Sequence, residues 1–172
     1  DPEVLLSRKT GRFYIYPTTD GYPGWGGYSF NVFSSPNLVD FTDEGTFLNL
    51  SAHKDVEWAS GNAWAPSIEE KWIDGKWKYY FYFSGHNPVL NKKTLGVAVS
   101  ESPTGPFVAS SKPLFTSSNA GQMIDSDVFT DPVSRQSYLY YGNGKLCYRL
   151  LSDDMMSVKG NEYTITPIGG TL

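Results

Sequence analysis

Residues 76–83 read Lys-Trp-Lys-Tyr-Tyr-Phe-Tyr-Phe (KWKYYFYF) and follow directly after the pair Asp74-Gly75. Aromatic residues are enriched in β-strands, and an Asp-Gly pair between two such runs is a strong signal for a tight hairpin turn. Residues 67–72, just before the turn, supply the partner strand. The stretch therefore predicts a β-hairpin.

The same arrangement occurs twice more along the chain. Residues 12–16 (RFYIY) pair with residues 3–6, and residues 137–141 (SYLYY) pair with residues 127–130. The apolar runs are short, aromatic or β-branched, and bounded by Gly, Pro, Asn, Asp and Ser, which is typical of strands. No long amphipathic helix is indicated, so the predicted fold class is all-β.

Each hairpin is followed by two further predicted strands, so that the units begin near residues 1, 65 and 125. Repeated units of four antiparallel strands are the blades of a β-propeller. The alternative is an antiparallel sandwich in which aromatic hairpins recur by chance. Closed propellers need roughly 4 to 8 blades, so the sequence predicts a partial propeller. The predicted blades span about residues 1–60, 61–120 and 121–172. The predicted third strands are residues 29–33, 95–99 and 146–150, and the outer strands are 42–47, 107–110 and 163–166.

The composition excludes several classes of protein. Aromatic residues make up 16% of the 172 residues and charged residues 19%, which is not the composition of a disordered chain. A net charge of -4 argues against nucleic acid as a partner. Cys147 is the only cysteine, and with His53 and His86 it offers too few ligands for zinc. No apolar run reaches the roughly 18 residues of a membrane span.

The predicted repeat relates two of the acidic residues, Asp1 and Asp125, to each other. Aligning the hairpins places Asp1, Ala65 and Asp125 at equivalent positions, each leading into the first strand of its unit. In a propeller this strand lies nearest the central channel. Two carboxylates would then face one pocket. This arrangement suits general acid and general base catalysis of glycosidic bond hydrolysis. The plainer interpretation is a solvated chain terminus at Asp1 and an ordinary turn residue at Asp125.

Several ordered motifs extend this interpretation. They are DPE at residues 1–3, NAWAPS at 62–67, GVAVSESPTGPF at 96–107, GQMID at 121–125 and YLYYGNG at 138–144. Together they closely resemble glycoside hydrolase family 43. The resemblance implies a five-bladed propeller that hydrolyses xylosyl or arabinofuranosyl linkages of plant cell-wall polysaccharides with inversion. It also implies a secreted or periplasmic protein.

The resemblance assigns roles to the two aspartates. The family's general base falls on Asp1, and its auxiliary aspartate, which positions the substrate and raises the pKa of the acid, falls on Asp125. The family's general acid is a glutamate of a later blade. Glu162 is the nearest late glutamate, but it stands in a predicted polar turn without the family's surroundings. We therefore expect the 172-residue chain to be at best weakly active.

Three further residues are predicted to contact substrate. The family places the tryptophan of its Trp-Ala-Pro motif, here Trp64, at the sugar-binding end, although a core tryptophan is the alternative. Trp25 stands in a glycine-rich loop, where a core position is not expected. Asn143 follows a strand of the third unit, with a simple turn as the alternative. Trp58, Trp72 and Trp77 are interpreted as packing residues.

No cofactor and no metal site are predicted within this chain. Some family members hold a cation such as Ca²⁺ in the channel through later blades, so this possibility concerns only a complete propeller. The predicted partner is a xylo- or arabino-oligosaccharide. Three blades leave two apolar faces open, so we also expect association with another copy, a partner chain or C-terminal blades. The functional alternatives are a fructoside-specific furanosidase and a non-catalytic carbohydrate-binding or interaction propeller.

Overall fold

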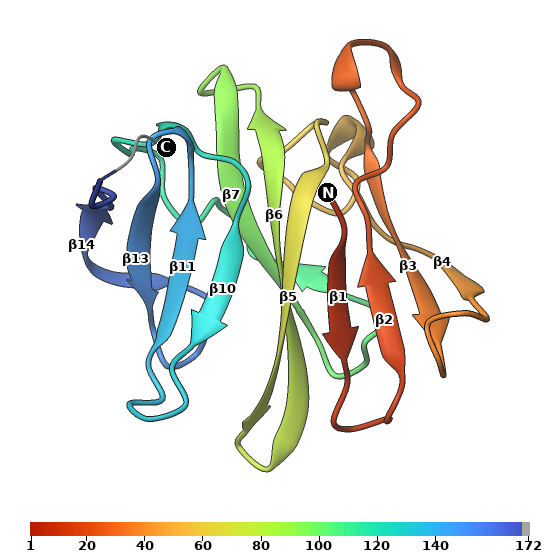
Figure 1. Ribbon diagram of the computed structural model, residues 1–172. Helices are drawn as coiled ribbons and strands as arrows, with labels where there is room; N and C mark the ends of the chain where they lie inside the picture. The colour runs from red at the N-terminus through yellow and green to blue at the C-terminus, as the bar shows by residue number, and fades with distance from the viewer. Residues whose placement is uncertain (170–172) are drawn as a thin grey trace.

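The computed structural model describes residues 1–169 and contains three antiparallel sheets of four strands each (Figure 1). Each sheet is a simple meander in which strands consecutive in the chain pair with one another. The first sheet contains β1 (Glu3–Leu6), β2 (Phe13–Tyr16), β3 (Ser29–Ser35) and β4 (Thr42–Asn49). The second contains β5 (Trp64–Ile73), β6 (Lys76–Asn87), β7 (Lys92–Ser100) and β8 (Val108–Ala109). The third contains β10 (Asp127–Thr130), β11 (Ser137–Tyr141), β13 (Cys147–Leu151) and β14 (Val158–Thr164).

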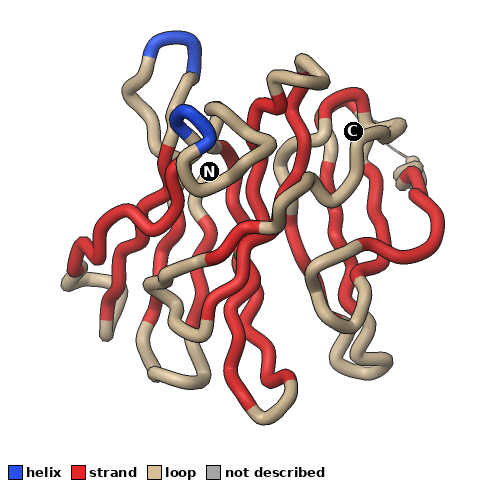
Figure 2. Tube along the Cα trace, turned by 180° about the vertical axis from the view of Figure 1, so that it is seen from behind, coloured by secondary structure: helices blue, strands red, loops and turns tan. Residues whose placement is uncertain are grey.

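The smaller elements lie in the connections. A parallel pair joins β9 (Gly121–Gln122) to β12 (Asn143–Gly144). Two single-turn 3₁₀ helices, η1 (Pro23–Trp25) and η2 (Ser51–His53), are the blue segments of Figure 2. The predicted outer strand of the third unit was misplaced, because β14 spans Val158–Thr164. Residues 159–162, which the sequence predicts to form a polar turn, belong to this strand instead.

The registers of the three hairpins bear out the predicted repeat. At the equivalent position of each inner strand, an apolar residue stands opposite an apolar residue of the second strand: Val4 opposite Ile15, Ile68 opposite Phe81, and Val128 opposite Leu139. The inner strands β1, β5 and β10 run in the same direction side by side (Figure 1), and β5 contacts both neighbours. The all-β partial propeller predicted from the sequence is therefore confirmed.

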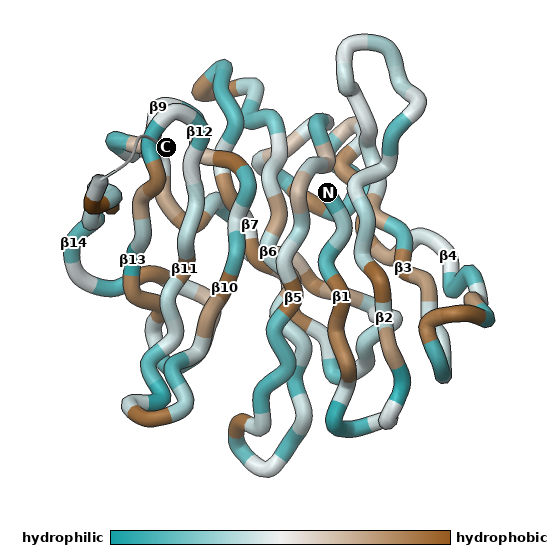
Figure 3. The backbone as a smooth tube through the Cα atoms, in the orientation of Figure 1, coloured by the Kyte–Doolittle hydropathy of each residue, from teal (hydrophilic) through white to brown (hydrophobic). Residues whose placement is uncertain are grey.

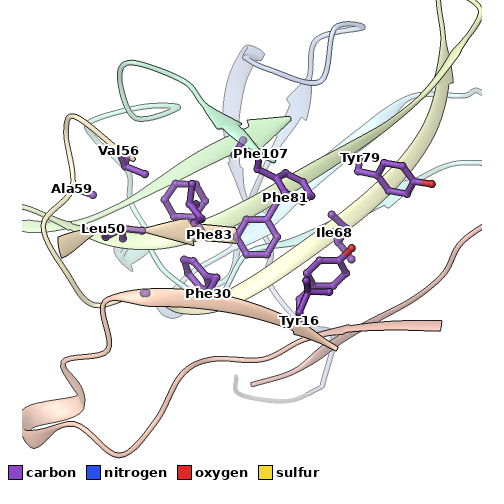
Figure 4. Packing of buried hydrophobic residues seen from close by; sticks show 14 of the residues in the cluster. Tyr16, Phe30, Leu50, Val56, Ala59, Ile68, Tyr79, Phe81, Phe83 and Phe107 are labelled. Carbon is purple, nitrogen blue, oxygen red and sulfur yellow. The ribbon is translucent and has the colours of Figure 1, made fainter. Parts of the chain in front are cut away.

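Two hydrophobic cores hold the arc together, and each lies between successive sheets. Figure 4 shows the first, where Phe30 of β3 packs against Phe81 and Phe83 of β6 with ring centroids 4.9 and 5.7 Å apart. The second includes Tyr80 and Tyr82 of β6. Strand β6 thus buries its odd-numbered aromatic residues on one side and its even-numbered tyrosines on the other. In Figure 3 the hydrophobic end of β1 is brown, whereas the turn joining β1 to β2 is teal and hydrophilic.

One hydrogen bond is repeated at both boundaries between sheets. The Tyr16 hydroxyl donates to the Pro103 carbonyl oxygen at 2.6 Å, and the Tyr82 hydroxyl donates to the Met155 carbonyl oxygen at 2.8 Å. Both tyrosines occupy the same register position, and both acceptors follow the third strand of the next sheet. The equivalent residue of the third sheet is Tyr140, which pairs with Asp127 as Tyr82 pairs with Ser67.

Candidate active site

An open pocket of about 360 Å³ lies where the inner strands begin. In Figure 1 this is the end at which β1, next to the N-terminus, β5 and β10 all start. The loop between β2 and β3 contributes the remaining wall. The pocket is lined by Asp1, Thr18, Asp20, Trp25, Trp64 and Asp125.

The backbone repeats its conformation at the entry to two of the three inner strands, β5 and β10. Asp125 has a φ of +57°, and its counterpart Ala65 has a φ of +38°. Few non-glycine residues adopt this left-handed region, and it occurs twice here at the same register position. Asp125 and Asp1 both line the pocket at this end of the inner strands.

Thr18 connects two of the strand entries. Its backbone N–H donates to the Asp1 carbonyl oxygen at 3.2 Å, and its hydroxyl accepts the backbone N–H of Ala65 at 2.9 Å. The start of β1, the end of β2 and the start of β5 are thereby fixed against one another. Sequence reasoning missed Thr18, because its role depends on the space between two blades rather than on a motif.

The pocket contains three carboxylates. Asp1 and Asp125 were predicted, but Asp20, in the loop after β2, was not. Asp125 is exposed, but the protein atoms around its carboxyl displace part of the water there, and this desolvation raises its pKa above the usual range. A cluster of carboxylates in a concave site, one of them with a perturbed pKa, can hold sugar hydroxyls and transfer protons.

Trp25 and Trp64 also line this pocket. Trp25 lies at the end of η1 with 77% of its surface exposed, whereas Trp64, the first residue of β5, is half-buried. The Trp64 indole Nε1–H donates to the Trp25 carbonyl oxygen at 2.5 Å. An exposed indole beside carboxylates is the arrangement by which proteins stack on a sugar ring and bind its hydroxyl groups.

Comparison with known proteins identifies the group to which this chain belongs. The sequence model of glycosyl hydrolases family 43 matches residues 1–170. This chain belongs to that family. The resemblance seen in the sequence motifs is thereby confirmed.

Relatives within family 43 are longer than this chain. A β-D-galactofuranosidase of Aspergillus niger is 32% identical over 98% of this chain and 50% of its own length. An arabinoxylan arabinofuranohydrolase of Bacillus subtilis is 33% identical, over 84% of this chain and 31% of its own length. The chain thus spans half or less of the length of these relatives.

Solved structures of family 43 proteins confirm the fold. The arabinoxylan arabinofuranohydrolase from Bacillus subtilis, solved with cellotetraose, superposes with a TM-score of 0.78 at 31% identity, covering 96% of this chain and 40% of that one. An α-L-arabinofuranosidase from Clostridium thermocellum gives a TM-score of 0.76 at 32% identity, covering 97% of this chain and 56% of that one.

The candidate Asn143, and Glu162, which the sequence did not favour as the acid, lie elsewhere in this family 43 chain. Asn143 belongs to β12, opposite Gly121 and Gln122, and is not among the residues that line the pocket. Its contact with substrate stays a prediction. Glu162 does not lie in a turn, as predicted, but within β14.

The Glu162 carboxylate is occupied by contacts with the third sheet and with the segment that precedes β9. Its side chain is 7% exposed and accepts hydrogen bonds from the Tyr141 hydroxyl at 2.5 Å and the Asn119 N–H at 2.7 Å. Arg149 lies 3.4 Å from it. Glu162 is thus a structural residue of its sheet and does not line the pocket.

The remaining tryptophans separate into two groups. Trp58 is buried and stacks on Phe83 with ring centroids 5.7 Å apart, as a packing residue should. Trp72 is 60% exposed, so the packing predicted for it does not take place in either core. It stands at the end of β5 opposite Trp77, and the two rings meet edge to face. The long β5–β6 hairpin extends past the cores, which leaves its tip in solvent.

No metal site and no membrane span are found in the part of the chain that the structure describes. Within residues 1–169, no group of three His, Cys, Asp or Glu side chains could hold a metal ion. No helix there is long and apolar enough to cross a bilayer. A cation in the channel stays a prediction for a complete propeller.

Proposed function

We propose that this chain forms the sugar-binding and base-bearing part of an inverting glycosidase that acts on arabinofuranosyl or xylosyl linkages outside the cell or in the periplasm. The pocket that gathers Asp1, Asp125 and Trp25 carries this proposal. Relatives described as arabinofuranohydrolase and α-L-arabinofuranosidase support the substrate class. None of the relatives named above is a fructosidase, so the fructoside alternative has no support.

In the proposed mechanism, Asp1 is the general base that removes a proton from the attacking water. Inversion requires that this water approach the anomeric carbon from the face opposite the leaving group. Asp125 binds sugar hydroxyl groups and places a negative charge near the acid, whose pKa it thereby raises. A raised pKa keeps the acid protonated until the leaving oxygen takes its proton.

The acid itself is absent from the pocket in the described residues. Asp20 is the third carboxylate there, and no glutamate lines the pocket within residues 1–169. We propose that the general acid comes from polypeptide that completes the ring. Asp20 lies on an exposed loop, where it serves as a hydrogen-bond acceptor for a sugar hydroxyl.

A non-catalytic sugar-binding module is the alternative. Trp25 alone would satisfy such a module, since stacking on a sugar face needs no carboxylate. A second aspartate at the register position where blade two carries alanine favours a catalytic pocket. Measurements of hydrolysis distinguish the glycosidase from the sugar-binding module.

Binding of xylotriose and arabinotriose, measured by titration calorimetry, tests the proposed site. Asp125→Ala is expected to weaken binding of the preferred sugar about 10- to 100-fold, because hydrogen bonds to a charged group are lost. Alanine suits this backbone, since Ala65 adopts the equivalent left-handed conformation. Asp153→Ala, a change at an exposed carboxylate of the same blade, is the control. Equal affinities of the two variants would contradict the site.

We further propose that another blade covers the outer face of the third sheet, whether from a second copy, a partner chain or further polypeptide. Tyr138, Tyr140, Tyr148 and Tyr163 contact one another across that face, with the last two rings stacked at 5.0 Å. No sheet covers them within the described residues (Figure 1). Tyr140 occupies the register position of Tyr16 and Tyr82 in the first two sheets, and each of those tyrosines donates a hydrogen bond to the following sheet.

Light scattering on the 172-residue chain tests this coverage. We expect a concentration-dependent mass above 19.2 kDa, because two blade faces are left open. Tyr148→Asp should shift the mass toward the monomer, whereas Trp72→Asp, on the exposed hairpin tip, should not. A wild-type chain that stays monomeric at all concentrations would argue against the proposal.

A further inference from the structure

The loop between β2 and β3 holds Trp25 in an unusual backbone conformation. Gly24 and Trp25 are consecutive left-handed residues, with φ values of +65° and +60°. A bulky residue in this region is strained and persists only where its surroundings hold it. Trp25 lines the pocket that contains Asp1 and also a second pocket beside Tyr22. Its exposed ring is therefore oriented mainly by its own backbone.

Three hydrogen bonds from the segment entering β5 hold this backbone. The Trp25 carbonyl oxygen accepts the Trp64 Nε1–H at 2.5 Å and the Asn62 Nδ2–H at 3.3 Å. The Gly27 carbonyl oxygen accepts the Ala63 N–H at 2.9 Å. A loop of blade one is thus fastened to the first strand of blade two, directly at the mouth of the pocket.

The surroundings of Trp64 restrict what else its ring can do. The Lys93 ammonium lies 4.7 Å from the ring centroid, so it covers one face of the indole. The N–H edge is engaged by Trp25. One face and one edge of Trp64 are therefore already occupied without any ligand.

We propose that Trp64 is a positioning residue, whose indole N–H holds the Trp25 loop so that the Trp25 ring forms the wall on which the sugar stacks. This inference deepens the proposed function and depends on it for the nature of the ligand. Trp25 makes the contact with the sugar, and Trp64 acts through the Trp25 main chain. The prediction from the sequence, in which Trp64 itself contacts the sugar, is replaced by this indirect role.

Phenylalanine at position 64 separates the two roles, because it keeps an aromatic ring and removes the N–H. With xylotriose and arabinotriose as probes, Trp64→Phe is expected to weaken binding about 5-fold, the effect of one lost hydrogen bond. Trp25→Ala should weaken it more, and the double variant should bind no worse than Trp25→Ala alone. Lys93→Met, which leaves the N–H in place, should bind as the wild type does. Wild-type affinity in Trp64→Phe with weak binding in Trp64→Ala would overturn the proposal.

A second measurement needs no sugar, so failure of the positioning role can be distinguished from failure of the proposed function. In NMR spectra of the 172-residue chain, the Trp64 indole N–H is expected to exchange with solvent at least 10-fold more slowly than that of the exposed Trp72. In Trp64→Phe, the resonance of the Trp25 indole should shift while the midpoint of thermal unfolding stays near the wild-type value. Equally fast exchange at Trp64 and Trp72, or an unmoved Trp25 resonance, would overturn the inference.

Discussion

Xylobiose is expected to be hydrolysed by the 172-residue chain about 10²- to 10⁴-fold more slowly than by the Bacillus subtilis arabinofuranohydrolase assayed on its own arabinoxylan. This factor is what general acid catalysis typically contributes. The pocket supplies Asp1 and Asp125, but within residues 1–169 no glutamate stands ready to protonate the leaving oxygen. A sugar alkoxide is a poor leaving group, so loss of the acid lowers the rate of xylobiose hydrolysis strongly.

The leaving group provides an internal control for this prediction. 4-Nitrophenolate departs without a proton, so the deficit should be much smaller for 4-nitrophenyl β-D-xyloside than for xylobiose. Asp1→Ala should abolish the residual activity on both substrates, because the base is needed in either case. An equal deficit on both substrates would contradict a missing acid. Full activity on xylobiose would contradict it too, and would point to Asp20 as the acid.

Glu3→Gln is expected to raise the free energy of unfolding at pH 8 by about 1–2 kcal/mol. Burial, followed by the negative charges of Asp127 and Glu69, raises the pKa of the Glu3 carboxyl from 4.5 to about 7. These three carboxylates stand on the three adjacent inner strands. A shift of this size corresponds to about 3 kcal/mol, and we halve it because Glu3 is only half-buried and solvent screens its charge.

The direction of the pH dependence follows from the raised pKa of Glu3. The folded chain favours the protonated carboxyl, so its contribution to stability is complete below about pH 4.5 and is lost as the pH rises through about 7. Urea unfolding of the wild type and Glu3→Gln at pH 4.5, 6 and 8 should therefore give curves that diverge as the pH rises. The exposed Glu57→Gln is the control. Parallel stability curves for Glu3→Gln and the wild type would contradict this account.

The repeating part of the fold was predictable from the sequence, because the same pattern of aromatic strands and turn residues occurs in each of the three units. Three aromatic hairpins with equivalent registers are specified by local alternation and turn residues, as in the pairing of Ile68 with Phe81. The outer strands were less predictable. Strand β14 passes through Gly160 and Asn161, which read as a turn. They lie at the irregularity between the pairs Leu150–Lys159 and Tyr148–Tyr163, so the pairing of their neighbours with β13 keeps them within the strand. Tertiary pairing overrides local propensity at such positions.

Some residues of the candidate site were likewise predictable from the sequence and others were not. Asp125 could be located because its register position repeats that of Asp1. Thr18 and Asp20 could not, since they lie in a loop of blade one that has no counterpart in the other blades. The role now proposed for Trp64 depends on a contact between blades, with Trp25, that neither motif contains on its own.

A crystal structure of the 172-residue chain with xylotriose or arabinotriose bound would show whether the pocket at the start of the inner strands is the sugar site. We expect one sugar ring in the pocket at the start of the inner strands, stacked on Trp25, with its anomeric carbon facing Asp1 and a hydroxyl group bonded to Asp125. An ordered sugar on another face of the molecule, with this pocket holding only water, would contradict it.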